Sequence, residues 1–144
     1  MRLTSYTDYA FRLLMFAGLK NGELATIQEA ADAYGISKNH LMKVAYELGR
    51  HGLIETVRGR NGGIRLAKEP EKIRLGDVVR LMEDDLAMVE CFVPATNTCP
   101  ISRACSLKRA LGEALDAYLK VLDRYTLADL TNQRAGLMRL LKSA

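Results

Sequence analysis

Three cysteines lie close together in the sequence and could bind a metal ion. Cys91, Cys99 and Cys105 are the only cysteines of the 144-residue chain, and they fall within fifteen consecutive residues. Pro94 and Pro100 interrupt this segment, so we expect an irregular loop rather than a helix or a strand. Thiolates ligate zinc ions and iron–sulfur clusters, which usually take four protein ligands. Three cysteines therefore leave one coordination position for another residue.

The same cysteines admit two other interpretations. Thiols in an exposed loop could be redox-active, and their clustering could also have no chemical role. A disulfide framework is disfavoured, because the cysteine count is odd and no apolar signal stretch follows Met1. These features favour a reducing, cytoplasmic compartment. No run of about 20 apolar residues occurs, so we expect no membrane span.

The net charge of +4 is unevenly distributed along the chain. Residues 36–68 carry seven basic and two acidic side chains, whereas residues 69–90 carry three basic and seven acidic ones. A local basic patch is a common way to bind a polyanion, although a solvated basic face has the same composition. A polyanion-binding role therefore needs support from the elements that carry the charge.

The first of these elements is a helix near the N-terminus. Apolar residues recur every three or four positions over residues 4–20, and Asn21 with Gly22 provides an ending. Ser5 and Asp8 have the spacing of a capping box. From the residues alone, Asp8 therefore has a structural role at the start of the helix.

Two shorter helices follow and form a helix-turn-helix pattern. Residues 27–34 predict a helix that Thr26 caps, through a capping box with Glu29, and that Gly35 ends. Ser37 is then expected to cap a third helix. A helix, a short glycine-containing turn and a helix are typical of DNA-binding proteins, although small helical bundles also contain such pairs. The apolar face of the third helix comprises Leu41, Val44, Ala45 and Leu48.

A predicted β-hairpin makes the DNA-binding interpretation more specific. The β-prone runs 52–57 and 64–66 flank a turn that contains Asn61 and Gly62, a strong hairpin signal. A hairpin directly after the third helix predicts a winged helix-turn-helix. Arg58 and Arg60 at its tip suit the phosphates and the narrow minor groove of DNA. The alternative is a turn that only aids solubility.

The C-terminal part predicts a dimerisation helix. Residues 75–82 form a fourth helix, and the acidic residues 83–85 after it are interpreted as a solvated helix stop. Beyond the cysteines, apolar residues at alternating spacings of four and three predict the seam of a paired helix. Residues 1–82 are expected to close a core without this helix, so dimerisation through it is favoured. A final helix from Thr126 is expected to fold back on the dimer or the partner subunit. The seam residues are Leu107, Leu111, Ala114, Tyr118, Val121 and Tyr125.

The predicted fold is thus mainly α with a small β-hairpin wing. Residues 1–82 are assigned to a winged helix-turn-helix DNA-binding domain and residues 83–106 to a cysteine cluster-binding loop. Residues 107–144 are assigned to the dimerisation helix and the C-terminal helix. This order of parts resembles the bacterial iron–sulfur winged-helix regulators, and most of all their nitric-oxide-sensing repressors. The resemblance rests on MRLTSYTDYA at the start, TVRGRNGGIRL in the wing, IRLGDVVR in the fourth helix and YTLADL near the end.

The resemblance implies an iron–sulfur cluster with a fourth ligand. In the IscR branch a histidine three residues after the third cysteine completes the set, but this chain has Lys108 there. Its two histidines, His40 and His51, lie in the expected recognition helix and at its end. In the nitric-oxide-sensing branch an aspartate of the other subunit is the ligand, and Asp8 matches it. The implied ligands of a 4Fe-4S cluster, with 2Fe-2S as the alternative, are Cys91, Cys99, Cys105 and Asp8 of the partner subunit.

The resemblance also implies a homodimer that binds double-stranded DNA at an inverted-repeat operator. Asn39 and Lys43 are expected to read adenine and guanine, while Ser37 and Arg60 contact phosphate. Nitric oxide would be the signal, with operator affinity lost when it reacts with the cluster. The full set of expected DNA contacts is Ser37, Asn39, Met42, Lys43, Arg58 and Arg60.

Other functions remain open at this stage. The same fold could respond to iron or cluster supply, as in the RirA or IscR branches, and the approach to Cys91 and the seven-residue first gap suit a RirA-like protein. A DNA-binding module stabilised by zinc, without a sensing role, is a third interpretation. An enzyme is disfavoured, because no substrate-positioning constellation or nucleotide motif accompanies the cysteines.

Overall fold

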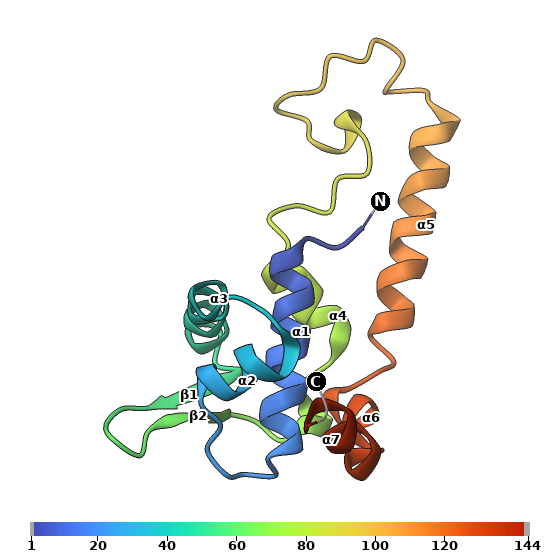
Figure 1. Ribbon diagram of the computed structural model, residues 1–144. Helices are drawn as coiled ribbons and strands as arrows, with labels where there is room; N and C mark the ends of the chain where they lie inside the picture. Colours follow the sequence, from blue (N-terminus) through green and yellow to red (C-terminus); the bar gives the residue numbers. More distant parts are fainter. Residues whose placement is uncertain (1, 143–144) are drawn as a thin grey trace.

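The computed structural model describes residues 2–142 and confirms a mainly helical fold with one β-hairpin (Figure 1). Among the described residues, none of the helices combines the length and the apolar character that a membrane crossing requires. The elements are α1 (Ser5–Leu19), α2 (Ile27–Tyr34), α3 (Lys38–Arg50), β1 (Ile54–Val57), β2 (Gly63–Leu66), α4 (Leu75–Met82), α5 (Ser106–Leu122), α6 (Leu127–Thr131) and α7 (Arg134–Lys142), with 3-10 turns at Pro70–Lys72 and Glu90–Phe92.

The start of α1 differs from the expectation. Thr4 is the N-cap, and its hydroxyl accepts a hydrogen bond from the backbone N–H of Thr7 at 3.2 Å. The predicted capping box between Ser5 and Asp8 is therefore wrong, because the cap lies one residue earlier. Asp8 instead forms an ion pair with Arg12, one turn further along, at 2.8 Å.

The helix-turn-helix forms as predicted. Thr26 and Glu29 form the reciprocal capping box, with N–H to oxygen distances of 3.0 and 2.7 Å. Gly35 ends α2 in the left-handed conformation, with φ 63° and ψ 35°, which glycine adopts without steric cost. Ser37 precedes α3, but its side chain forms no capping hydrogen bond, which corrects that expectation. The exposed hydroxyl of Ser37 therefore does not bind the first turn of α3.

The wing is an antiparallel hairpin that is fixed to the helical domain. Val57 pairs with Gly63 at the outer end, and Ile64 also pairs with Ala25, which precedes α2. A Cβ atom at position 63 would lie 2.6 Å from the carbonyl oxygen of Ala25, so only glycine permits this approach. Glu55 and Arg65 form an ion pair across the two strands. The base of the wing therefore has a defined position relative to α3.

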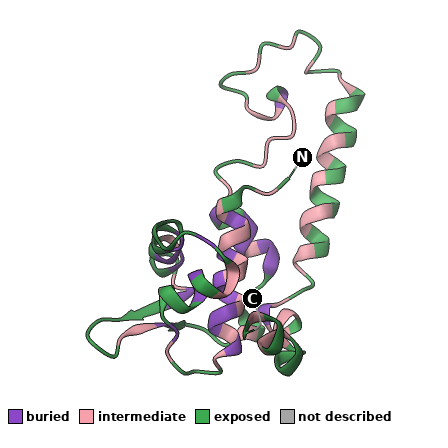
Figure 2. Ribbon diagram, in the orientation of Figure 1, coloured by how far each residue is buried: buried purple, intermediate pink, exposed green. Residues whose placement is uncertain are grey.

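The core includes a residue from the C-terminal part of the chain. Leu127 of α6 is fully buried and belongs to the same cluster as residues of α1, α3 and α4. Buried residues gather on α1 and the helices around it, whereas α5 has none (Figure 2). The core therefore forms without α5, as expected, but it includes Leu127 in addition to residues of the first 82 positions. Thr126 caps α6 through the expected box with Asp129. The other large, fully buried residues are Leu13, Leu14, Leu19, Leu41, Leu48, Ile64 and Ile73.

The C-terminal segment folds back on its own subunit. It forms two helices, α6 and α7, instead of the single helix expected from Thr126. Arg134 donates a hydrogen bond from Nε to the backbone oxygen of Leu19 at 2.7 Å, and so caps the end of α1. Within the single subunit, this segment packs against α1 and α2.

Candidate DNA-binding surface and cysteine loop

Three of the six residues predicted to contact DNA share one exposed face of α3. Leu41 and Val44 point into the core, whereas Asn39, Met42 and Lys43 lie on the solvent side. The side chain of Met42 is 52% exposed, which is unusual for a large apolar residue. The helical period thus separates a packing face from a face that is free to contact a partner.

This face continues beyond the residues that sequence reasoning selected. Tyr46 is 67% exposed, and the guanidinium of Arg50 lies over its ring at 6.0 Å from the centroid. Both follow Asn39 and Lys43 at the helical spacings of three and four. The same periodicity that identified the buried face could therefore have found them. Arg50 also pairs with Glu47 at 3.1 Å.

The first helix holds the recognition helix in place. The hydroxyl of Tyr6 donates a hydrogen bond to the backbone oxygen of Lys43 at 3.0 Å. The ring of Tyr9 stacks on His40, with 6.3 Å between the centroids. Asp8 lies between these two tyrosines in α1. A movement of α1 at Asp8 would therefore be transmitted to α3 through two direct contacts.

The arginines of the wing lie beyond its last paired residues. Arg58 and Arg60 are exposed on either side of Gly59, which has φ 113°. In Figure 1 the wing extends on the same side of α1 as α3. The exposed face of α3 and the wing tip both present basic groups, namely Lys43 on α3 and Arg58 and Arg60 on the wing. Such a surface can contact both base edges and phosphates.

The three cysteines are free thiols in an irregular loop, as expected. Cys91 is 9% exposed, while Cys99 and Cys105 are half-buried. The Asn97 side chain shapes the loop, because its Oδ1 accepts from the N–H of Cys99 and its Nδ2 donates to Ser102. The loop therefore has a specific fold of its own.

Cys105 has a distinct position at the start of α5. It is the N-cap, and its Sγ accepts a hydrogen bond from the N–H of Lys108 at 3.4 Å. The N-terminus of a helix favours negative charge, so this position suits a thiolate ligand. Lys108 contributes only its backbone N–H to this contact. The histidine ligand that the IscR branch has at this position is therefore missing here.

The four expected ligands do not converge within one subunit. Across residues 2–142, no three side chains of histidine, cysteine, aspartate or glutamate form a group that could hold a metal ion. Asp8 is occupied by Arg12 in this arrangement. The chemistry of the donors nevertheless fits an iron–sulfur cluster, because three soft thiols without disulfide partners share a short loop. A fourth donor must come from elsewhere.

The acidic residues after α4 have local structural roles. Glu83 accepts hydrogen bonds from the N–H of Thr4 at 2.9 Å and from its hydroxyl at 3.1 Å. Asp85 accepts one from the N–H of Ala87 at 2.8 Å. Glu83 therefore connects the start of the cysteine loop to the start of α1.

Comparison with protein families identifies the class of regulator. The family model Rrf2, described as an iron-dependent transcriptional regulator, matches residues 3–133. The chain belongs to the Rrf2 family. This confirms the resemblance seen in the sequence and shows that the chain is a transcriptional regulator.

Two curated relatives match this Rrf2 protein over nearly its whole length. The HTH-type transcriptional regulator NsrR of Bacillus subtilis is 56% identical over 143 residues, covering 99% of this chain and 98% of that protein. The NsrR of Bacillus licheniformis is 55% identical over 142 residues, covering 98% and 99%. The similarity therefore extends over nearly the whole length of this chain and of both relatives.

Solved structures confirm the winged-helix fold of this Rrf2 protein. CymR, the global cysteine regulator of B. subtilis, matches with a TM-score of 0.76 and 25% identity, covering 92% of this chain and 98% of that one. IscR of T. potens matches with a TM-score of 0.71 and 24% identity, covering 92% and 88%.

Proposed function

We propose that this protein is a nitric-oxide-sensing repressor that binds an inverted-repeat operator as a homodimer. Its similarity to NsrR regulators and the exposed face of α3 support this function. The observation that carries the proposal is the linkage of Asp8 to the recognition helix. Tyr6 and Tyr9, on either side of Asp8, contact Lys43 and His40 of α3.

DNA binding is proposed to use two subunits. One copy of α3 would enter each of two successive major grooves, which lie about 34 Å apart, and the wings would contact the adjoining minor grooves. Asn39, Met42 and Lys43 would face the bases, and Ser37, Arg58 and Arg60 the backbone. Because both half-sites must be engaged, operator affinity depends on the distance between the two α3 helices.

Dimerisation is proposed to occur along α5. This helix has no buried residue in the single subunit, and the seam residues Leu107, Val121 and Tyr125 are exposed. Large apolar side chains at heptad spacing are unfavourable in water and favourable in a paired helix. A second copy would cover them and would bring its own α1 near the cysteine loop of the first.

The proposed cluster is held by Cys91, Cys99 and Cys105 together with Asp8 of the partner subunit. The form is 4Fe-4S or 2Fe-2S. When bound, the cluster supplies an iron site with affinity for nitric oxide, and the carboxylate is the harder and more readily displaced ligand. Once displaced, Asp8 has Arg12 as its alternative partner, at the 2.8 Å seen in the single subunit. The change at Asp8 would then move α1 and, with it, α3.

The decisive experiment is an anaerobic nitric oxide titration followed at once by absorbance and by operator gel shift. The purified protein should be brown, with absorbance above about 400 nm from iron–sulfur charge transfer. Absorbance loss and operator release should coincide. Colourless protein with bound zinc, or operator binding that is indifferent to nitric oxide, would contradict the proposal.

The proposed role of Asp8 has a test of its own. Asp8→Ala should change the stability of the cluster and its sensitivity to nitric oxide, whereas Asp116→Ala on the exposed side of α5 should not. If both variants match the parent in spectrum and response, Asp8 is only the partner of Arg12.

A second candidate function is a response to iron or cluster supply. The description of the matching family as iron-dependent favours it. Under this alternative, iron chelation without nitric oxide would release the operator. The same gel shift, repeated with a chelator in place of nitric oxide, separates the two signals.

A further inference from the structure

The cysteine loop and α5 form a projection that leaves the winged domain and returns to it. We call residues 83–122 the arm. The chain leaves at Met82, where α4 ends, and returns at Asp123, the C-cap of α5. Figure 1 shows α5 and the loop extending away from the other helices. No residue of α5 is buried, and α5 contacts the winged domain at α4, so the fully buried core does not extend along this helix within one subunit.

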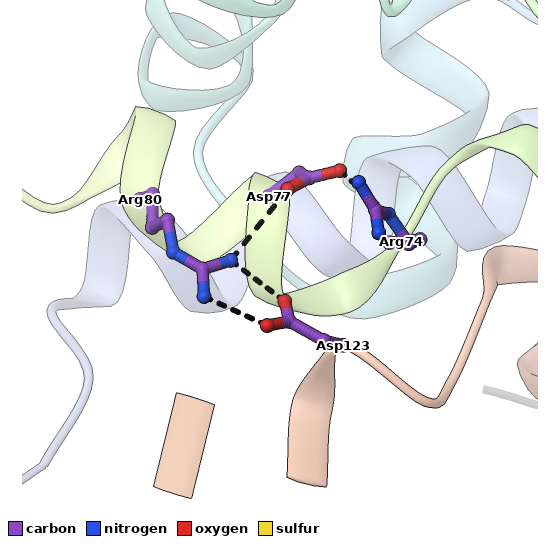
Figure 3. A network of polar contacts seen from close by, with 4 residues as sticks. All are labelled: Arg74, Asp77, Arg80 and Asp123. Carbon is purple, nitrogen blue, oxygen red and sulfur yellow. Dashed lines mark hydrogen bonds and ion pairs between the residues drawn. The ribbon is translucent and has the colours of Figure 1, made fainter. Parts of the chain in front are cut away.

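The two ends of the arm are joined by an ion pair between Arg80 and Asp123. Arg80 Nη1 lies 2.7 Å from Asp123 Oδ1, and Nη2 lies 2.8 Å from Oδ2 (Figure 3). Two parallel hydrogen bonds fix the relative orientation of the two groups, which a single contact does not. Arg80 lies in the last turn of α4, and Asp123 directly follows the last turn of α5. We call this pair the clamp.

A second ion pair supports the clamp. Asp77 lies 3.5 Å from Arg80 Nη1 and accepts a hydrogen bond from Arg74 Nε at 3.0 Å. Alternating charges thus run along one side of α4, from Arg74 through Asp77 to Arg80, and end at Asp123 (Figure 3). Asp77 restrains the guanidinium of Arg80 in the position that meets Asp123.

Gly76 provides the space that the clamp needs. A Cβ atom at this position would lie 1.9 Å from Asp123 Oδ1 and 2.8 Å from Arg80 Nη1. Glycine normally destabilises the interior of a helix relative to alanine. Because Gly76 has no side chain, the carboxylate of Asp123 can approach the backbone of α4. Any larger residue would have to displace the clamp.

Backbone contacts fix the chain directly after the arm. The N–H of Leu75 donates to the oxygen of Tyr125 at 3.0 Å, and the N–H of Leu127 donates to the oxygen of Ile73 at 2.8 Å. These bonds hold residues 125–127 beside the start of α4. They lie beyond the last turn of α5, so the side chain of Asp123 is the polar contact nearest to that helix.

We propose that Arg80 and Asp123 are positioning residues that set the direction of the arm relative to the winged domain. This inference rests on the proposed function, because in the dimer the direction of α5 determines the distance between the two α3 helices. A change at the cysteine loop then reaches the DNA-binding surface through the clamp, in addition to the route through α1. Without the clamp, the arm pivots about residues 123–125.

The first test measures the direction of the arm directly and needs no cluster, operator or dimer. Nitroxide labels are attached through keto amino acids at Arg109 in α5 and Gln28 in α2, so the three cysteines stay unmodified. Labelled protein is diluted with excess unlabelled protein, so that only distances within one subunit are recorded. The parent should give one narrow distance distribution by pulsed electron resonance.

Matched variants identify the clamp as the cause. Asp123→Asn and Gly76→Ala should broaden or shift the distribution. Asp116→Asn and Gly112→Ala, which make the same chemical changes in α5, should leave it as in the parent, since a Cβ atom at Gly112 meets nothing within 4 Å. Distributions for Asp123→Asn and Gly76→Ala that superimpose on that of the parent would overturn the inference.

The second test measures regulation. The ratio of operator affinities with and without the cluster should fall roughly threefold to tenfold in Asp123→Asn, as for other mutations that weaken coupling between sites. Cluster content and dimer mass should stay as in the parent. Arg80→Lys, which keeps the charge but not the paired hydrogen bonds, should give an intermediate ratio. An unchanged ratio in Asp123→Asn would contradict the regulatory role.

The two tests separate this inference from the proposed function. If the operator affinity of the parent does not depend on the cluster, the proposed function fails, while the label distances still decide whether the clamp directs the arm. If the operator affinity of the parent depends on the cluster and that of Asp123→Asn depends on it equally, the regulatory role of the clamp is contradicted. The proposed function is then unaffected.

Discussion

The hydroxyl of Tyr6 donates to the backbone oxygen of Lys43, so α1 supports α3 at a residue that we propose contacts DNA. Burial, followed by the negative charge of Glu47, raises the pKa of Tyr6 above its ordinary value of 10.0. The hydroxyl therefore stays protonated and donates throughout the neutral range. This contact links the helix that carries Asp8 to the helix that carries the side chains proposed to read bases.

Tyr6→Phe should reduce the free energy of unfolding by about 0.5–1 kcal/mol, the usual net contribution of one such hydrogen bond. The ring is kept, so the loss reports the hydroxyl alone. Urea unfolding measures it, with Tyr46→Phe on the exposed face of α3 as the control. Equal stability of Tyr6→Phe and the parent would show that the bond contributes nothing in solution.

Leu127→Ala should destabilise the protein by about 2–5 kcal/mol, because it removes a fully buried side chain from the core. Thermal or urea unfolding would show this as a single transition at lower temperature or denaturant concentration. Leu140→Ala, at a position that is 68% exposed, should change stability by less than about 0.5 kcal/mol. Similar values for the two variants would mean that α6 does not belong to the core in solution.

Arg58→Ala should weaken operator binding and reduce its dependence on salt. A plot of the logarithm of affinity against the logarithm of salt concentration should lose about one unit of slope, the effect of one phosphate contact. Arg139→Ala in α7, away from the wing, should keep the slope of the parent. If Arg58→Ala also keeps that slope, Arg58 does not contact phosphate.

Glu29 should make stability depend on pH in the acidic range. The hydrogen bond from the backbone of Thr26 is the largest cause that lowers the pKa of Glu29 below its ordinary value of 4.5. A lowered pKa in the folded state means that the unfolded chain binds the proton more tightly. The contribution is therefore complete above pH 4.5 and is lost as the pH falls through the folded-state pKa.

Glu29→Gln should accordingly be less stable than the parent at neutral pH and should approach it in acid. Urea unfolding at a series of pH values measures the difference. Glu23→Gln, at an exposed position before α2, should run parallel to the parent at all pH values. A constant difference between Glu29→Gln and the parent would contradict the assignment.

Local patterns predicted the helix-turn-helix and the wing, because their signals lie within a few residues. The bounds of α2 and α4 are those expected, and Gly35 ends α2 as its flexible backbone suggested. The N-cap of α1 was misassigned because Thr4 and Ser5 are adjacent hydroxyl residues. Only the backbone shows that Thr4, with ψ 155°, is the residue outside the helix.

Long-range features had no local signal. Nothing near Leu127 indicates that it enters a core formed by residues far earlier in the chain. The ion pair of Arg80 with Asp123 had no local signal either. The chain contains many arginines and many aspartates, and these two residues lie far apart in the sequence. The cysteines were found by their spacing, whereas Asp8 entered only through resemblance, since its proposed partners belong to another subunit.

The burial of Leu127 imposes an order on biosynthesis. During translation the ribosome completes α1 to α4 before it makes the arm, and Leu127 emerges only after both. Until then the nascent winged domain lacks part of its interior, and α1 lacks the cap that Arg134 gives it. A newly made chain therefore acquires its stable DNA-reading form only when the segment proposed to sense the signal has already been synthesised.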